Sequence, residues 1–174
     1  MTNLTNTNLA HKIISTANLK NLKITTAESC TGGLIGGTLT AVSGSSSVYD
    51  GGFITYANEA KRDMLGVPWD LLMDKGAVSP DVAEAMAHGA LSKTSPSCQL
   101  AVSVTGIAGP GGGTAEKPVG LVYFGLATAF SQNNIGITHQ KVIFREVSRD
   151  SIRQRTIETA LKMLQQAIDR APDK

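Results

Sequence analysis

Apolar positions along the chain recur at helical spacing in some segments and in continuous runs in others. Leu4, Leu9, Ile13, Ile14 and Ala17 lie on one helical stripe, which predicts a first helix ending in the region 18–21. About residues 1–8 are polar, and we expect this start to be frayed. Strands are predicted at 22–27, at 48–56, which is opened by Gly51-Gly52, and at 99–105. Further helices are predicted at 31–42, 58–65, 68–73 and 79–93.

The last third of the chain predicts a hairpin followed by a long helix. Strands are expected at 119–129 and 135–144, separated by the polar turn 131–134, and Ser148 is expected to cap a helix that runs until Pro172. Helical crossovers imply parallel strand pairing, whereas the short turn implies an antiparallel pair. The pattern therefore predicts an α/β fold, a three-layer sandwich around a mixed, mostly parallel sheet with helices on both faces.

Composition limits the classes of protein that the chain can represent. Its 174 residues, 41% hydrophobic and 17% charged, fit one globular domain spanning residues 1–174. A net charge of +2 with 5% aromatic residues gives no basic, stacking surface, so nucleic-acid binding is not expected. The polar N-terminus and the absence of an 18-residue apolar run predict a cytoplasmic protein without a membrane partner. Cys30 and Cys98 form no CxxC pair, which is typical of a reducing compartment.

The segment Ala27-Glu28-Ser29-Cys30-Thr31-Gly32-Gly33 is the first candidate for chemistry. It follows an apolar run and precedes a glycine-rich predicted helix, so Ser29 would stand at the turn from a strand into a helix. We expect Thr31 to cap that helix and the glycine-rich helix to be buried. A tight turn with a polar cap and no chemistry is the alternative interpretation.

Two further polar segments follow predicted strands, at 56–61 and 105–113. Ligands bind at the carboxyl ends of parallel strands, so the three segments are expected to converge on one crevice. A buried Lys61 near a helix N-terminus would have a lowered pKa and could take a proton from Ser29. The alternative is that Lys61 is a solvated helix residue.

The third segment and the histidines exclude several other chemistries. Residues 105–114 match neither the P-loop nor the GxGxxG pattern, although their backbone N–H groups could bind an anion or oxyanion; a flexible surface loop is the alternative. His11, His88 and His139 stand apart without metal-binding spacing. We therefore expect no metal and no cofactor.

Seven ordered motifs resemble one family, the CinA C-terminal domain family of nicotinamide mononucleotide deamidases. The resemblance covers about residues 25–167. The motifs are Ala27-Glu-Ser-Cys-Thr-Gly-Gly33, Ser43-Gly-Ser-Ser, Tyr56-x-Asn-x-x-Lys61, Leu65-Gly-Val67, Gly76-Ala-Val-Ser79, Thr105-Gly-Ile-Ala-Gly-Pro110 and Lys117-Pro-Val-Gly120.

The resemblance implies a three-layer α/β/α amidohydrolase in stand-alone form, acting on a small pyridine nucleotide and releasing ammonia. It implies that Ser29 is the nucleophile, Lys61 the general base and Tyr56 a neighbouring hydroxyl that orients the lysine or the substrate. We also expect a homo-oligomer. The residues expected to bind the substrate are Cys30, Thr31, Gly32, Gly33, Ser45, Ser46, Thr105, Gly106 and Arg149.

One segment departs from the family pattern. Members usually carry Gly-Asp-Arg and, four residues after that arginine, a second one before the last helix; here the chain reads Phe144-Arg-Glu-Val-Ser-Arg149-Asp-Ser-Ile-Arg153. The arginine spacing is kept, whereas the glycine and the aspartate are not. If these arginines hold the substrate phosphate or a neighbouring subunit, activity could be weakened, and a non-catalytic nucleotide-binding or regulatory protein is the alternative. Both arginines could instead be solvated helix residues.

Overall fold

The structure is a computed structural model, and it describes residues 4–131, 134–145 and 148–172. One five-stranded sheet forms its centre, with the strand order β2-β1-β3-β4-β5. The strands are β1 (Ile24–Glu28), β2 (Tyr49–Ile54), β3 (Leu100–Gly106), β4 (Leu121–Ser131) and β5 (Asn134–Ile143).

The sheet is mixed, as the sequence predicted. β1 pairs in parallel with both β2 and β3, while β3–β4 and β4–β5 are antiparallel. Two strand pairs are therefore parallel and two are antiparallel. Four of the five strands run in the same direction, and β4 runs in the opposite one. The predicted hairpin is β4–β5, and Gln132 and Asn133 of its turn lie outside the described residues.

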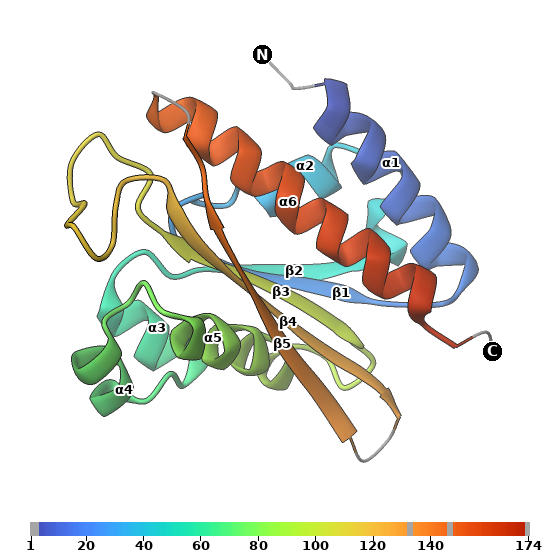
Figure 1. The fold of residues 1–174 in the computed structure, drawn as a ribbon. Helices are drawn as coiled ribbons and strands as arrows, with labels where there is room; N and C mark the ends of the chain where they lie inside the picture. The colour runs from blue at the N-terminus through green and yellow to red at the C-terminus, as the bar shows by residue number, and fades with distance from the viewer. Residues whose placement is uncertain (1–3, 132–133, 146–147, 173–174) are drawn as a thin grey trace.

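Helices cover both faces of the sheet, which makes three layers (Figure 1). One layer holds α1 (Leu4–Leu19), α2 (Leu34–Thr40) and α6 (Arg149–Arg170). The opposite layer holds α3 (Asn58–Leu65), α4 (Trp69–Lys75) and α5 (Pro80–Lys93). A 3₁₀ turn at Ser45–Ser47 leads into β2. Within the described part of the chain, no helix is both long and apolar enough to cross a membrane.

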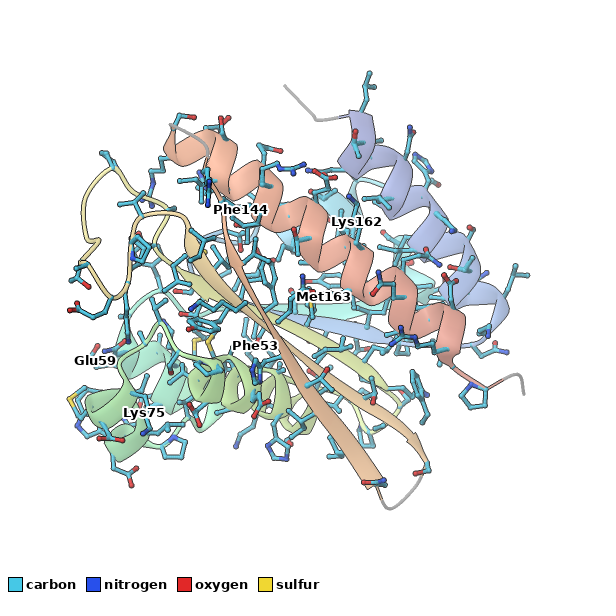
Figure 2. The ribbon with its side chains drawn as sticks, viewed as in Figure 1. Phe53, Glu59, Lys75, Phe144, Lys162 and Met163 are labelled. Carbon is cyan, nitrogen blue, oxygen red and sulfur yellow. The ribbon has the colours of Figure 1, made fainter. Side chains whose placement is uncertain are left out.

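The central strand β3 separates two cores. Leu100, Val102 and Val104 face the α1/α2/α6 layer, whereas Ala101 between them faces the α3/α4/α5 layer, following the two-residue period of a strand. Figure 2 shows Met163 of α6 between this helix and the sheet, in the first of these cores. Strand β3 therefore packs against helices on both of its faces.

The N-terminal helix begins earlier than the expected frayed start. It is helical from Leu4, and the side chain of Asn6 is buried, with its amide nitrogen donating to the Gln154 backbone and side-chain oxygens at 3.4 and 3.3 Å. Leu4, placed on the apolar stripe from sequence, is instead 80% exposed. A polar residue thus docks α1 against α6 at this end, which an apolar pattern could not reveal.

The predicted starts of several helices can be compared with the structure. Ser148 accepts from the Ser151 N–H at 3.1 Å, so its predicted cap is confirmed. The helix predicted to begin at Ser79 is capped by this serine, which accepts from the Val82 N–H at 3.3 Å. Asn58 is the first residue of α3, as the predicted range 58–65 has it, and the N-cap is Ala57. The glycine-rich helix is only half buried, since Gly37 faces solvent.

Candidate functional site

A pocket of about 290 Å³ lies where β1, β2 and β3 end. Its walls come from the segments that follow these three parallel strands, completed by the loop before α5 and the first turn of α6. The predicted convergence of 28–33, 56–61 and 105–113 is therefore confirmed, and the carboxyl edge of the sheet holds the site, as is general for such sheets. The pocket is lined by Ser29, Cys30, Tyr56, Lys61, Ala77, Val78, Thr105–Ala108, Gly109, Gly111, Gly112 and Arg149.

Ser29 is the first residue after β1, and its side chain reaches the pocket while the residue is 8% exposed. Its backbone N–H continues the sheet by donating to the Val104 carbonyl at 3.1 Å, and its carbonyl accepts from the Gly32 N–H at 3.0 Å. The backbone of Ser29 is thus held by the neighbouring strand and by a tight turn. Its hydroxyl is presented from a backbone position that these two hydrogen bonds hold.

Lys61 lies on the first turn of α3 and is 1% exposed, which excludes the solvated interpretation. Its Nζ is 3.2 Å from Ser29 Oγ, 2.8 Å from the Thr55 carbonyl oxygen and 3.2 Å from the Tyr56 carbonyl oxygen. The structure therefore brings the predicted pair within hydrogen-bonding distance. The last residue of α3, Leu65, packs tightly on α5 because Gly89 has no side chain, and this contact anchors the helix that carries Lys61.

Burial is the main electrostatic influence on Lys61. Desolvation disfavours the ammonium form and lowers the pKa of Lys61 from 10.5 to about 8, partly opposed by the nearby Cys30 thiol. An ammonium can donate to all three oxygen neighbours. A neutral amine has two N–H groups for the two carbonyls, so its lone pair faces the Ser29 hydroxyl. The same geometry thus fits both protonation states of a general base.

Glu28 is a buried carboxylate directly before Ser29. It is 1% exposed and accepts hydrogen bonds from the Thr31 hydroxyl at 2.7 Å and from the N–H groups of Gly33, Ile35 and Gly36 at 2.8–3.0 Å. The N-terminus of α2 is therefore capped by Glu28, which corrects the expectation that Thr31 caps it. Positive φ angles at Gly32 and Gly33 (62° and 96°) give the turn the shape that this capping needs.

Two arginines of α6 reach the site from the other layer. Arg149 donates to the Gly109 carbonyl at 2.7 Å and to the Tyr56 hydroxyl at 3.1 Å, so it links two walls of the pocket. Arg153 donates to the carbonyls of Cys30 and Thr31 at 3.2 and 3.0 Å. The altered segment thus keeps both arginines at the site, although Glu146 and Val147 lie outside the described residues.

Three other predicted residues reach the pocket wall. Tyr56 contacts Lys61 through its backbone carbonyl, whereas its hydroxyl pairs with Arg149. Thr105 is buried, and its hydroxyl donates to the Ala77 carbonyl at 2.7 Å, which ties the loop before α5 to β3. Burial raises the pKa of the Cys30 thiol to about 11, so Cys30 is a wall residue with no thiolate near neutral pH.

Several predicted binding residues lie away from the pocket wall. Ser45 and Ser46 precede β2, whose first residue pairs with the first residue of β1, so they stand at the opposite end of strands about 16 Å long. The Thr31 hydroxyl and the Gly33 N–H are occupied by Glu28, and Gly32 lies against Arg153 rather than on the pocket wall. The structure does not bring these five residues to the pocket.

Some site residues were missed from sequence. Ala77 and Val78 form part of the wall, yet they are small apolar residues whose role depends on a loop position that only the tertiary structure fixes. The sequence predicted Glu28 only as a member of the segment 27–33, with no role of its own. A charged residue ending an otherwise uncharged strand was the available signal, because a buried carboxylate requires partners. The described residues contain no group of three His, Cys, Asp or Glu side chains placed to hold a metal ion.

The fold and the site together define an α/β/α protein with a serine–lysine pair in a pocket at the carboxyl edge of its sheet. Comparison with known sequences then identifies the family: residues 6–168 match the model of the CinA C-terminal domain, and the chain belongs to this family. A crystal structure of the competence/damage inducible protein CihA from Agrobacterium tumefaciens is 48% identical and superposes with a TM-score of 0.88, covering 95% of this chain and 96% of that one.

Curated relatives are of two lengths. A putative competence-damage inducible protein of Caldicellulosiruptor bescii is 56% identical over 120 residues, 69% of this chain but 29% of the relative. The chain likewise spans about a third of other such relatives. The nicotinamide-nucleotide amidohydrolase PncC of Escherichia coli is 46% identical over 143 residues, 82% of both chains.

Proposed function

We propose that this protein is an amidohydrolase that converts nicotinamide mononucleotide to nicotinate mononucleotide and ammonia. The observation that carries the proposal is the 3.2 Å contact between Lys61 Nζ and Ser29 Oγ at the pocket wall. Its support from comparison is the relative of similar length that is named a nicotinamide-nucleotide amidohydrolase. A pocket of about 290 Å³ also has the size of a small-molecule site.

In the proposed reaction, Ser29 attacks the carboxamide carbon while neutral Lys61 takes the hydroxyl proton. The carbon–oxygen bond forms, and the carbonyl electron pair moves onto oxygen to give a tetrahedral oxyanion. Lys61 then gives this proton to the carboxamide nitrogen, and the carbon–nitrogen bond breaks. Ammonia leaves, and the substrate acyl group stays bound to Ser29 as an ester. Water, deprotonated by the same lysine, attacks the ester carbon. The bond from this carbon to the Ser29 oxygen then breaks, Lys61 returns the proton to that oxygen, and the acid product leaves as the carboxylate after losing its proton to solvent.

Charge at the pocket fits an anionic substrate. Arg149 stands at the pocket with its guanidinium between Tyr56 and Gly109, and the glycine loop 109–112 presents backbone groups to the same space. A guanidinium suits a phosphate, which it can bind through two parallel hydrogen bonds. We assign Arg149 to the phosphate, with Thr105 and Gly106 as wall positions near the reacting group.

The proposal is tested by incubating the purified protein with nicotinamide mononucleotide and measuring ammonia and nicotinate mononucleotide in the same samples. Equimolar appearance of both products is expected. Binding in a calorimeter without turnover would instead support the non-catalytic nucleotide-binding alternative. Free nicotinamide, which lacks the ribose phosphate, serves as the matched control and is expected to react far more slowly, because remote binding energy contributes to the transition state.

A further inference from the structure

The turn that carries Ser29 is held from two sides by residues that do not line the pocket. On one side the Glu28 carboxylate accepts four hydrogen bonds of 2.7–3.0 Å from Thr31, Gly33, Ile35 and Gly36. On the other side the Arg153 guanidinium donates to the carbonyls of Cys30 and Thr31. Within residues 30–36, three backbone N–H groups are thus bound by an anion and two carbonyls by a cation.

We propose that Glu28 and Arg153 are positioning residues that fix the Ser29 hydroxyl against Lys61 by clamping the backbone of residues 30–36. The expected effect on kcat rests on the proposed function, whereas the claim that Glu28 and Arg153 hold the turn does not. Neither residue belongs to the pocket wall, so neither is a catalytic residue.

Burial makes this clamp more demanding than a surface hydrogen-bond network. Glu28 is 1% exposed, and burying a carboxylate is costly unless each oxygen is satisfied. The buried Thr26 hydroxyl, which is also 2.7 Å from the Tyr49 hydroxyl, is 3.4 Å from the second carboxylate oxygen. A neutral amide in place of the carboxylate would point its NH₂ group at N–H donors on one side, so the turn would have to move.

The clamp acts on distance, and distance governs proton transfer and attack. Ser29 Oγ lies 3.2 Å from Lys61 Nζ, at the outer limit of useful hydrogen-bond length. A displacement of the turn by about 1 Å costs roughly a hundredfold in rate when reacting groups lose alignment. Substrate binding depends on the residues of the pocket wall, so KM should change less than kcat. A positioning role therefore predicts a lower kcat with an almost unchanged KM.

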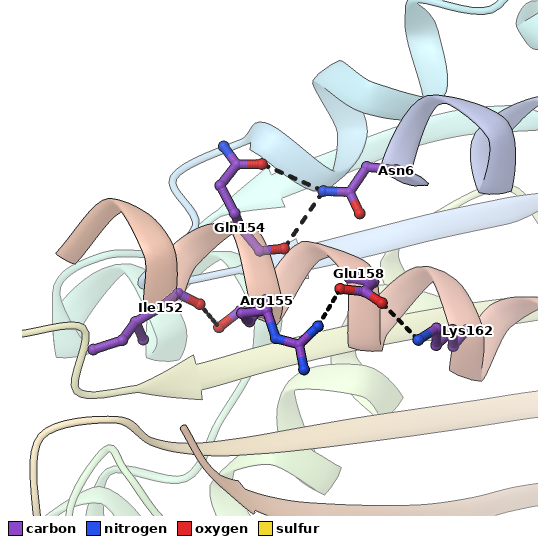
Figure 3. A network of polar contacts seen from close by, with 7 residues as sticks. Asn6, Ile152, Gln154, Arg155, Glu158 and Lys162 are labelled. Carbon is purple, nitrogen blue, oxygen red and sulfur yellow. Dashed lines mark hydrogen bonds and ion pairs between the residues drawn. The ribbon is translucent and has the colours of Figure 1, made fainter. Parts of the chain in front are cut away.

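The test compares Glu28→Gln and Arg153→Lys with the matched controls Glu158→Gln and Arg155→Lys. Glu158 is also buried and accepts from Arg155 and Lys162 at 2.7 and 2.6 Å, but it stands farther along α6 (Figure 3). We expect kcat to fall about 10- to 100-fold in both clamp variants, with KM within about twofold, and both constants within about twofold of the parent in the controls. Glu28→Asp, which keeps the charge, should retain more activity than Glu28→Gln.

Amide hydrogen exchange supplies a readout that does not depend on the substrate. The N–H groups of Gly33, Ile35 and Gly36 should exchange about tenfold faster in Glu28→Gln than in the parent, and those of β3 should not change. Parent-like kcat in folded Glu28→Gln, or unchanged exchange at these three amides, would overturn the proposal. If the parent itself released no ammonia, the proposed function would fail, while the exchange rates would still decide whether Glu28 holds the turn.

Discussion

At the scale of single residues, Lys61 combines a buried amine with two carbonyl acceptors, and this combination sets the protonation state in which the pocket can work. Both carbonyls, of Thr55 and Tyr56, are backbone groups that cannot be titrated. Among Lys61 and its hydrogen-bond partners, the amine is therefore the group whose pKa is brought towards neutrality, to about 8. Burial disfavours the charged form of Lys61 and so lowers its pKa to about 8. A general base that works near neutral pH requires such a lowered pKa.

Replacing Ser29 by alanine is expected to lower kcat by at least about a thousandfold, because the attacking oxygen is lost. Stability should change little, since Lys61 keeps its two carbonyl partners and the turn keeps its backbone bonds. Ammonia release and thermal unfolding measure the two effects. Ser45→Ala is the control, because Ser45 lies at the opposite end of the strands, and it should retain full activity. Parent-like turnover in Ser29→Ala would refute the nucleophile assignment.

The pH dependence of activity follows from the lowered pKa of Lys61. Only the neutral amine can accept the Ser29 proton, so kcat/KM should rise with pH through an apparent pKa near 8, well below the usual 10.5. Lys61→Arg keeps the charge but cannot lose its proton, and we expect it to be nearly as inactive as Lys61→Ala. A pH series on the parent and both variants gives the measurement. Substantial activity in Lys61→Arg would leave the residue only an electrostatic role.

At the scale of elements, the sequence predicted the types and order of the helices and strands, because long apolar periods and serine caps are local signals. The Ser29–Lys61 pair was likewise predictable, since both residues follow strands that a parallel sheet brings together. Other features depended on contacts between distant segments. The wall residues Ala77 and Val78 required the Thr105 hydrogen bond to place their loop, and the cap of α2 required the buried Glu28 side chain to fold back over its own turn.

Helix α2 contains adjacent glycines with opposite surroundings, which allows a paired test of its packing. A Cβ on Gly36 would meet the Tyr49 hydroxyl, whereas a Cβ on Gly37 would meet nothing within 4 Å. Gly37→Ala should stabilise the protein by up to about 1 kcal/mol through helix propensity. Gly36→Ala should instead destabilise it by about 1–3 kcal/mol through overpacking.

Urea unfolding of the two variants measures this difference. Combining Gly36→Ala with Tyr49→Phe, which removes the obstructing hydroxyl, should recover part of the lost stability. Equal effects of the two alanines on the free energy of unfolding would show that the tyrosine yields without cost, and that the glycine at 36 has no packing role.

At the scale of the whole molecule, one sheet is shared by two cores that lie on its opposite faces. Alternate residues of the same strand contribute to the two cores: Val102 of β3 belongs to one core and Ala101 to the other. Each helical layer packs on one face of this sheet, and the two layers share its strands. The pocket draws on both layers as well, with Lys61 from one and Arg149 from the other. Homo-oligomer formation stays a prediction, which light scattering on the purified protein would decide.

Because the two cores share their strands, we expect the protein to unfold in one transition. Leu161→Ala removes a fully buried side chain from the α1/α2/α6 layer, and Met86→Ala does the same in the α3/α4/α5 layer. Each substitution should lower the free energy of unfolding by about 2–5 kcal/mol. Trp69, the single tryptophan, lies on α4, so its fluorescence reports on the α3/α4/α5 layer. Its fluorescence should nevertheless shift with the circular dichroism signal in Leu161→Ala, since two-state unfolding makes all probes coincide. If the fluorescence midpoint stayed at the parent value while the dichroism midpoint fell, the layers would unfold independently, and the shared sheet would not couple them.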